Sequence, residues 1–161
     1  MRERSRTIDQ AAAVSYRLLL MIWGGALLYS GYVAAPLLFA QLADRQLAGA
    51  LAGSLFHATA LIGYLAAVLL LPLLWWWQQR WWGWRQRLVM IALLLVAVGD
   101  RLLQPQMAAL KSLGLTDPAV ASQFARWHGS AAILHLLVTL LILLLVATGT
   151  PARRPVAQRK A

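Results

Sequence analysis

The residues best suited to chemistry in this sequence are three histidines and one pair of opposite charges. His57, His128 and His135 carry imidazole rings, which bind copper, zinc or haem iron and change charge near neutral pH. Asp100 and Arg101 stand side by side inside the apolar stretch LLLVAVGDRLLQPQ. At the centre of a bilayer each of these charges would cost about 2.5 to 3.5 kcal/mol. The depth at which the chain places these five side chains therefore decides what they can do.

The histidines are the candidate metal ligands, and haem or copper are the cofactors that they would suit. Their spacing is not that of an HEXXH motif, and each histidine equally fits a hydrogen-bonded packing residue of a helix bundle. The chain has no cysteine, which excludes disulfides, thiolate metal sites and a cysteine nucleophile. It also lacks a nucleophile elbow, so the sequence does not favour an enzyme.

The composition is that of an integral membrane protein. Hydrophobic residues make up 61% and charged residues 12% of the chain, whereas soluble domains average about 45–50% and about 25%. Uncharged runs that cross the ~30 Å hydrocarbon core must be helical or form a closed barrel, because only these satisfy the backbone in lipid. The sequence predicts a single all-α membrane domain over residues 1–161, with four transmembrane helices at about 18–40, 48–77, 85–110 and 124–149 and basic tails at 1–16 and 151–161.

The net charge of +10 follows the pattern that orients membrane proteins. Only Arg45, Lys111 and Arg126 flank the helices on the side away from the termini. The positive-inside rule therefore places the N and C termini in the cytoplasm, together with Arg2, Arg4, Arg6, Arg17, Arg80, Arg85, Arg87, Arg153, Arg154, Arg159 and Lys160. The stretch WWWQQRWWGWRQR then forms an aromatic belt at the cytoplasmic interface. The partner implied is the lipid bilayer, and no nucleic acid is expected.

Small residues mark the faces that the helices would use for close packing. Gly49 and Gly53 form a GxxxG motif at the start of the second helix. Gly31 and Pro36 are the corresponding candidate packing residues of the first helix. In lipid, such faces let helix backbones approach closely. The pattern fits packing within the bundle, and it also fits a homo-oligomer or a larger membrane complex.

The third helix has two possible courses. If it runs well past Asp100, Gln104 follows one turn later and Lys111 lies close to the same face, so that a polar stripe faces the bundle. If it starts earlier, the charged pair sits at the outer interface and residues 102–113 form a surface helix. The apolar residues after the charges favour the first course. Whether Asp100 faces the bundle or the interface stays open.

Polar residues of the other helices reach a comparable depth. The second helix enters from the outer side, so His57 lies roughly 13 Å below its outer end at about 1.5 Å per residue. Asp117 and Pro118 have the types of an N-cap and a first helical residue for the fourth helix. The sequence thus predicts a polar pocket open to the periplasm, a ligand site or ion path formed by Asp100, Arg101, Gln104, His57, His128, His135 and Tyr32.

Three segments carry a resemblance to a known family: GYVAAPLLFAQLADRQLAGALAGSLFH, PQMAALK and FARWHGSAAILHLL. In this order they resemble bacterial relatives of transmembrane protein 205, the domain of unknown function 4149 family, over about residues 18–148. The resemblance implies a four-helix membrane protein without an established activity and a fold akin to copper resistance protein D-like membrane proteins. His57 and His135 look less like hallmarks of the family. The matching positions are Pro36, Phe39, Gly49, Gly53, Phe56, Pro105 and His128.

These observations support three hypotheses for a multi-pass protein of the bacterial inner membrane. The leading one is a transport or permeability factor, or an accessory subunit of one, whose polar pocket opens to the periplasm. The second is a redox or assembly protein associated with haem, copper or a quinone through histidine ligands. The third is a structural subunit whose small-residue faces pack against a larger membrane partner.

Overall fold

The computed structural model describes residues 2–78 and 83–151, which form helices joined by short turns. In chain order the elements are α1 (Arg2–Leu28), the π-helical segment η1 (Tyr29–Ala34), α2 (Ala35–Gln41), α3 (Arg45–Gln78), α4 (Trp84–Val98), the π-helical segment η2 (Gly99–Leu103), α5 (Gln104–Ser112) and α6 (Pro118–Ala147). These described residues contain no strand, which confirms the all-α class.

The elements combine into four long helices. The backbone is helical on both sides of η1 and of η2, so α1 continues into α2 and α4 continues into α5. The stretches Thr7–Gln41, Arg45–Trp77, Trp84–Ser112 and Pro118–Ala147 are each long and apolar enough to cross a membrane. The prediction of four such helices is confirmed. Each is longer than the roughly 20 residues that a ~30 Å hydrocarbon core requires.

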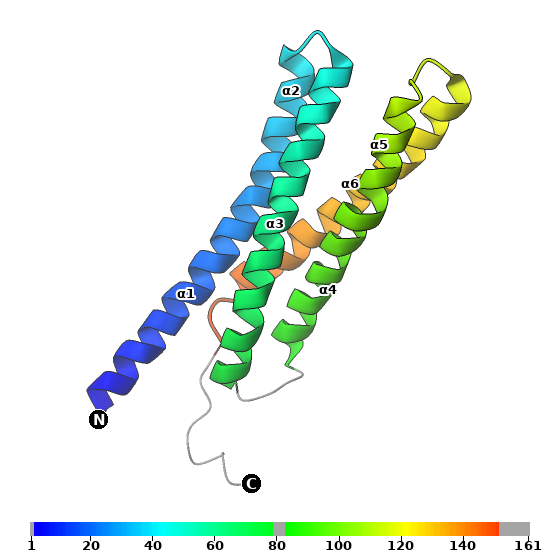
Figure 1. Cartoon of the computed structure of the whole chain (residues 1–161). Helices are drawn as coiled ribbons and strands as arrows, with labels where there is room; N and C mark the ends of the chain where they lie inside the picture. The colour runs from blue at the N-terminus through cyan, green and yellow to red at the C-terminus, as the bar shows by residue number, and fades with distance from the viewer. Residues whose placement is uncertain (1, 79–82, 152–161) are drawn as a thin grey trace.

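The four helices form two hairpins. The first helix turns back into α3 at residues 42–44, and the third turns back into α6 at residues 113–117. Both turns lie at one end of the molecule, here called the turn end (Figure 1). The start of α1 and the end of α6 lie toward the other end, here called the termini end. The first and third helices therefore both run from the termini end to the turn end.

The first helix begins earlier than the sequence analysis places it. We expected helix from about residue 18 and a tail over 1–16, whereas α1 starts at Arg2. The residues before Leu18 contain neither glycine nor proline, so nothing in them stops the helix. Residues 79–82, which include Arg80, and the rest of the predicted basic tail from residue 152 lie outside the described residues.

The fourth helix also begins earlier than the range 124–149 predicted for it. Its first residue is Pro118, and the carboxylate of Asp117 accepts a hydrogen bond from the Ala119 N–H at 2.8 Å. An aspartate at this position satisfies a backbone donor that the first helical turn leaves free. The Asp117–Pro118 pair therefore acts as the helix start that its residue types predict.

Both helices that run toward the turn end pass through a proline without a break. Pro36 has no N–H, and in an α-helix its ring would clash with the carbonyl four residues earlier. Instead, the preceding Ala35 donates its N–H to Ser30, five residues back, in a wider π-helical turn. The residue before Pro105 does the same, with the Gly99 carbonyl as acceptor. The third helix thus continues past the charged pair, and residues 102–113 are not a separate surface helix.

The buried core lies in the part of the bundle toward the termini end, where all four helices meet. Its largest fully buried side chains are Tyr16, Leu20 and Trp23 of α1, Leu70 and Leu74 of α3, Val89 of α4, and Ile142 and Leu145 of α6. Toward the turn end, α2 packs on α3 and α5 packs on α6, and the two hairpins separate (Figure 1).

Arg85 links three helices by hydrogen bonds at the termini end of the bundle. This residue is buried, and its guanidinium donates hydrogen bonds to the Thr148 carbonyl (2.9 Å), the Gly149 carbonyl and the Tyr16 hydroxyl (2.8 Å). A cation at a helix C-terminus satisfies carbonyls that lack a helical partner and opposes the helix dipole. An arginine that the sequence marks only as an orientation signal therefore joins α1, α4 and the end of α6.

Replacing this arginine should destabilise the fold. We expect Arg85→Gln to lower the free energy of unfolding by about 2 kcal/mol, because hydrogen bonds to a charged group contribute about 1.5–3 kcal/mol. The control is Arg87→Gln on the same helix, which removes the same charge from an exposed position. Thermal unfolding of the purified proteins measures the difference. Equal midpoints for the two variants would show that the Arg85 contacts do not hold the bundle together.

Candidate functional site

A cleft of about 950 Å³ lies between the two hairpins on the turn-end side of the core. Residues of all four long helices line it, together with residues 114–116 of the second turn. Its volume is within the range of about 300–1,000 Å³ found for sites that bind small molecules. The cleft is the candidate functional site.

The walls of the cleft are mainly apolar. Leu27, Leu95 and Val138, at its core end, are aliphatic, and the rings of Phe39, Phe56 and Phe124 line the walls nearer the turn end. Polar side chains are few and interrupt this surface at separate places. They are Tyr32, Arg45, Gln46, Thr59, Asp100, Gln104, Lys111, Thr116, His128 and His135. Such a surface suits a molecule with an apolar body and a small number of polar groups.

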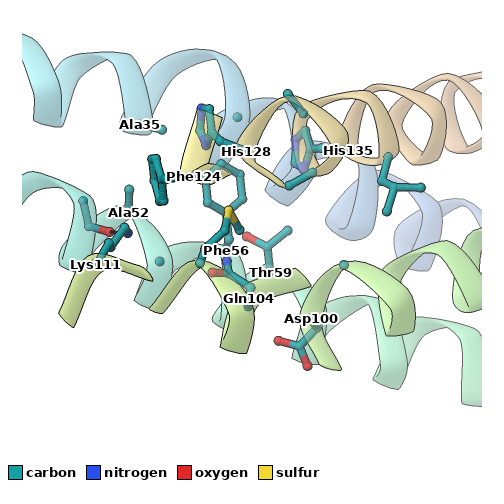
Figure 2. A pocket seen from close by; sticks show the side chains of 18 of the residues that line it. Ala35, Ala52, Phe56, Thr59, Asp100, Gln104, Lys111, Phe124, His128 and His135 are labelled. Carbon is teal, nitrogen blue, oxygen red and sulfur yellow. Dashed lines mark hydrogen bonds between the residues drawn. The ribbon is translucent and has the colours of Figure 1, made fainter. Parts of the chain in front are cut away.

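Five of the seven residues predicted to form the pocket line the cleft: Tyr32, Asp100, Gln104, His128 and His135. His57 and Arg101 do not line it. Both contact the Asp100 carboxylate, and their side chains are largely exposed. In Figure 2 the Asp100 carboxylate lies apart from His128 and His135 at the lower edge of the view. The predicted residues therefore form two groups that share Asp100.

Asp100 is the centre of the second group. Its carboxylate accepts hydrogen bonds from His57 Nδ1 at 2.7 Å and from the Tyr64 hydroxyl at 3.1 Å, and Arg101 Nε lies 3.3 Å from Oδ2. The Asp100 side chain is only 3% exposed, whereas those of His57 and Arg101 are 53% and 69% exposed. The Asp100 side chain thus points from η2 toward α3, into the bundle. The adjacent arginine offsets its charge, which lowers the cost of placing both near lipid.

The three histidines have different contacts and do not converge. His135 Nε2 donates to the Leu27 carbonyl at 3.0 Å, and its ring packs edge-on against Phe56. The imidazole of His128 stacks on Phe124 with ring centroids 5.8 Å apart. Within residues 2–78 and 83–151, no three His, Asp or Glu side chains are placed to hold a metal ion together. The described residues therefore do not assemble the three-histidine site considered from the sequence.

The small residues predicted to pack helices also line the cleft. Gly31, Pro36, Gly49 and Gly53 all contribute to its surface. A Cβ on Gly49 would come within 3.3 Å of Lys111 Nζ. One on Gly53 would meet the Gln104 side chain at 3.9 Å. The GxxxG face of α3 therefore makes room for side chains of α5 and for the cleft, rather than for close contact with a helix backbone.

Lys111 is a cleft residue that the sequence marks only as part of the polar stripe on the third helix. Its ammonium donates a hydrogen bond to the Gly49 carbonyl at 2.9 Å and lies 5.6 Å from the centre of the Phe124 ring. In the sequence, the spacing of Asp100, Gln104 and Lys111 indicates that Lys111 lies on the helix face that is turned toward the bundle. What the sequence lacks is the position of α3, which brings the glycine carbonyl to the lysine.

The fold and the cleft define the class: an all-helical protein with four helices able to span a membrane and a cleft between two hairpins. The chain belongs to the domain of unknown function 4149 family, whose model matches residues 18–116. The match begins inside α1, continues through the second and third long helices and ends in the turn before α6. Searches of curated proteins and of solved structures gave no match to the chain. The links to transmembrane protein 205 and copper resistance protein D stay predictions.

The contact between the first helix and His135 can be tested through Gly31. A Cβ at this position would overlap the His135 imidazole, whereas a Cβ at Gly25 on the same helix meets nothing within 4 Å. We expect Gly31→Ala to lower the thermal unfolding midpoint and Gly25→Ala to leave it unchanged or raise it, because alanine favours helix by about 1 kcal/mol over glycine. In a His135→Ala background the cost of Gly31→Ala should disappear. A cost that persists there would contradict the contact.

Proposed function

We propose that this protein binds an apolar or amphipathic small molecule in the cleft, as a transport or permeability factor or as the ligand-binding accessory subunit of one. The observation that carries the proposal is the cleft itself: about 950 Å³, apolar walls from all four long helices and a few separate polar groups. No set of side chains in the described residues suggests a catalytic reaction in it. Binding followed by release is the simplest use of such a site.

The depth of the cleft supports this proposal. Counted from Trp84, about 20 residues cross the ~30 Å hydrocarbon core, which brings the far boundary to about Gln104. Residues at the core end of the cleft, such as Leu95 and Val138, would then lie at acyl-chain depth, and Lys111 at the level of the headgroups. Arg101 is close enough to that boundary for its side chain to reach polar surroundings. An amphipathic molecule has the same order of apolar and polar parts.

The distribution of positive charge supports cytoplasmic termini and a cleft that opens to the periplasm, in a bacterial inner membrane. The structure leaves the redox and structural alternatives without a specific observation in their favour, since the three histidines do not converge and the small-residue face of α3 borders the cleft. A homo-oligomer or a larger membrane complex stays a prediction.

Reporter fusions test the orientation. A fusion after Lys111 should report the periplasm, and fusions after Arg80 or at the C-terminus should report the cytoplasm, because the positive charges flank the termini end. The readout is the activity of a reporter that works on only one side of the membrane. The reverse pattern would place the mouth of the cleft in the cytoplasm.

Ligand binding can be followed with a single fluorescent label, because the chain has no cysteine of its own. Thr116→Cys places the label on a residue that lines the cleft at the turn end. In phosphatidylcholine nanodiscs, dodecanol should give a saturable change in fluorescence. Adding Ala131→Phe, which fills part of the cleft, should weaken the apparent affinity by about tenfold, equivalent to about 1.4 kcal/mol.

The matched control is Ala125→Phe, on an exposed position of the same helix that does not line the cleft. It should leave the titration unchanged. The absence of saturation in the parent protein, or an equal loss in both phenylalanine variants, would refute the proposed binding function.

A further inference from the structure

The mouth of the cleft, defined by Arg45, Gln46, Lys111 and residues 114–116, carries two positive charges. Arg45 is the first residue of α3, and Gly49, whose carbonyl accepts the hydrogen bond from Lys111, follows one helical turn later. Arg45 and the carbonyl that holds the Lys111 ammonium therefore lie on neighbouring turns of α3. Both cations lie at the turn end, beyond the apolar walls.

These cations have no acidic partner in the part of the chain that the structure describes. No carboxylate there lies within ion-pair distance of Arg45 or Lys111. Asp44 and Asp117, at the same end, accept backbone N–H groups at the starts of α3 and α6. Asp100 is engaged by His57, Tyr64 and Arg101 on the other side of η2. Neither cation at the opening of the cleft is therefore held in an ion pair within the described residues.

Lys111 is held in place and still has capacity to bind. An ammonium group has three N–H donors, and only the Gly49 carbonyl takes one of them in the described structure. The nearby Phe124 ring stabilises the charge by a cation–π contact. The Arg45 guanidinium gives one hydrogen bond, to the Phe39 carbonyl at 3.3 Å, and keeps further donors. The remaining donors are suited to the oxygens of an anion.

We propose that the cleft selects anionic amphiphiles, membrane molecules with an apolar chain and a phosphate or carboxylate head. The head would bind to Lys111, with Arg45 adding to the positive potential, and the chain would extend between the aromatic walls toward Leu27 and Val138. This inference rests on the proposed binding function and adds the class of ligand. It follows from the position of Lys111, which has no ion-pair partner in the described residues, at the opening of a large apolar cleft.

The test compares three ligands on the Thr116→Cys reporter in phosphatidylcholine nanodiscs: dodecyl phosphate, dodecanol and inorganic phosphate. The first two have the same chain, with added ligand expressed as a fraction of the lipid. We expect dodecyl phosphate to bind about tenfold more tightly than dodecanol, the lower end of what a charge-assisted hydrogen bond contributes. Inorganic phosphate should bind far more weakly, because it has no chain to bury.

Lys111→Met removes the charge and keeps much of the side-chain length. It should abolish the preference for dodecyl phosphate while dodecanol still binds, and Lys111→Arg should retain the preference. The matched control is Arg126→Met. It removes one exposed positive charge at the turn end, on α6, from a residue that does not line the cleft. If Lys111→Met does not fold, the salt dependence of the parent protein serves instead: the preference should shrink as salt screens the charge.

The outcomes separate the two proposals. If neither dodecyl ligand saturates, the binding function itself is wrong. If both bind equally and Lys111→Met changes neither affinity, the cleft binds amphiphiles but does not select anionic ones. If inorganic phosphate competes as strongly as dodecyl phosphate, the mouth is a site for free anions, and the assignment to an amphiphile is overturned.

Discussion

The structure depends on one constraint: helices long enough to cross a membrane must keep their backbone hydrogen bonds although Pro36, Pro72 and Pro105 lie inside three of them. Pro36 and Pro105 each remove one donor, and in both cases the preceding residue bonds five residues back instead of four. The helices therefore remain continuous where a break would expose backbone groups to lipid. The same wider turn, η2, carries Asp100 into the space between α3 and the third helix.

Polar side chains are scarce in this chain, and the buried charged side chains of the described residues have specific partners. Arg85 bonds to the end of α6 and to α1, and Asp100 bonds to two residues of α3 and to its own neighbour. In low-dielectric surroundings an unpaired charge is costly, so such partners are expected. Lys111 differs, because its only hydrogen bond is to a carbonyl and no acid compensates its charge in the described residues. That difference singles it out as the group with capacity to bind a ligand.

The cleft itself results from small residues at the point where the two hairpins separate. Gly49, Ala52 and Gly53 present almost no side chain on α3, and the opposite hairpin reaches Gly49 and Gly53 with the side chains of Lys111 and Gln104. In lipid the same residue types often let two helices touch. The difference lies in the neighbour: when no helix backbone fills the space, a glycine face becomes the wall of a cleft.

The sequence by itself determined the all-helical class, the four helices and the cap at Asp117, because apolar length, composition and residue type act locally along the chain. It also identified Tyr32, Gln104 and His128, which do line the cleft. Only the tertiary structure decided that His57 and Arg101 contact Asp100 without lining the cleft, that His135 bonds to Leu27, and that Arg85 caps α6. These contacts join residues far apart in sequence, and helical periodicity fixes the face of one helix without fixing which helix it meets. The separation of the hairpins, and with it the cleft, follows from that packing alone.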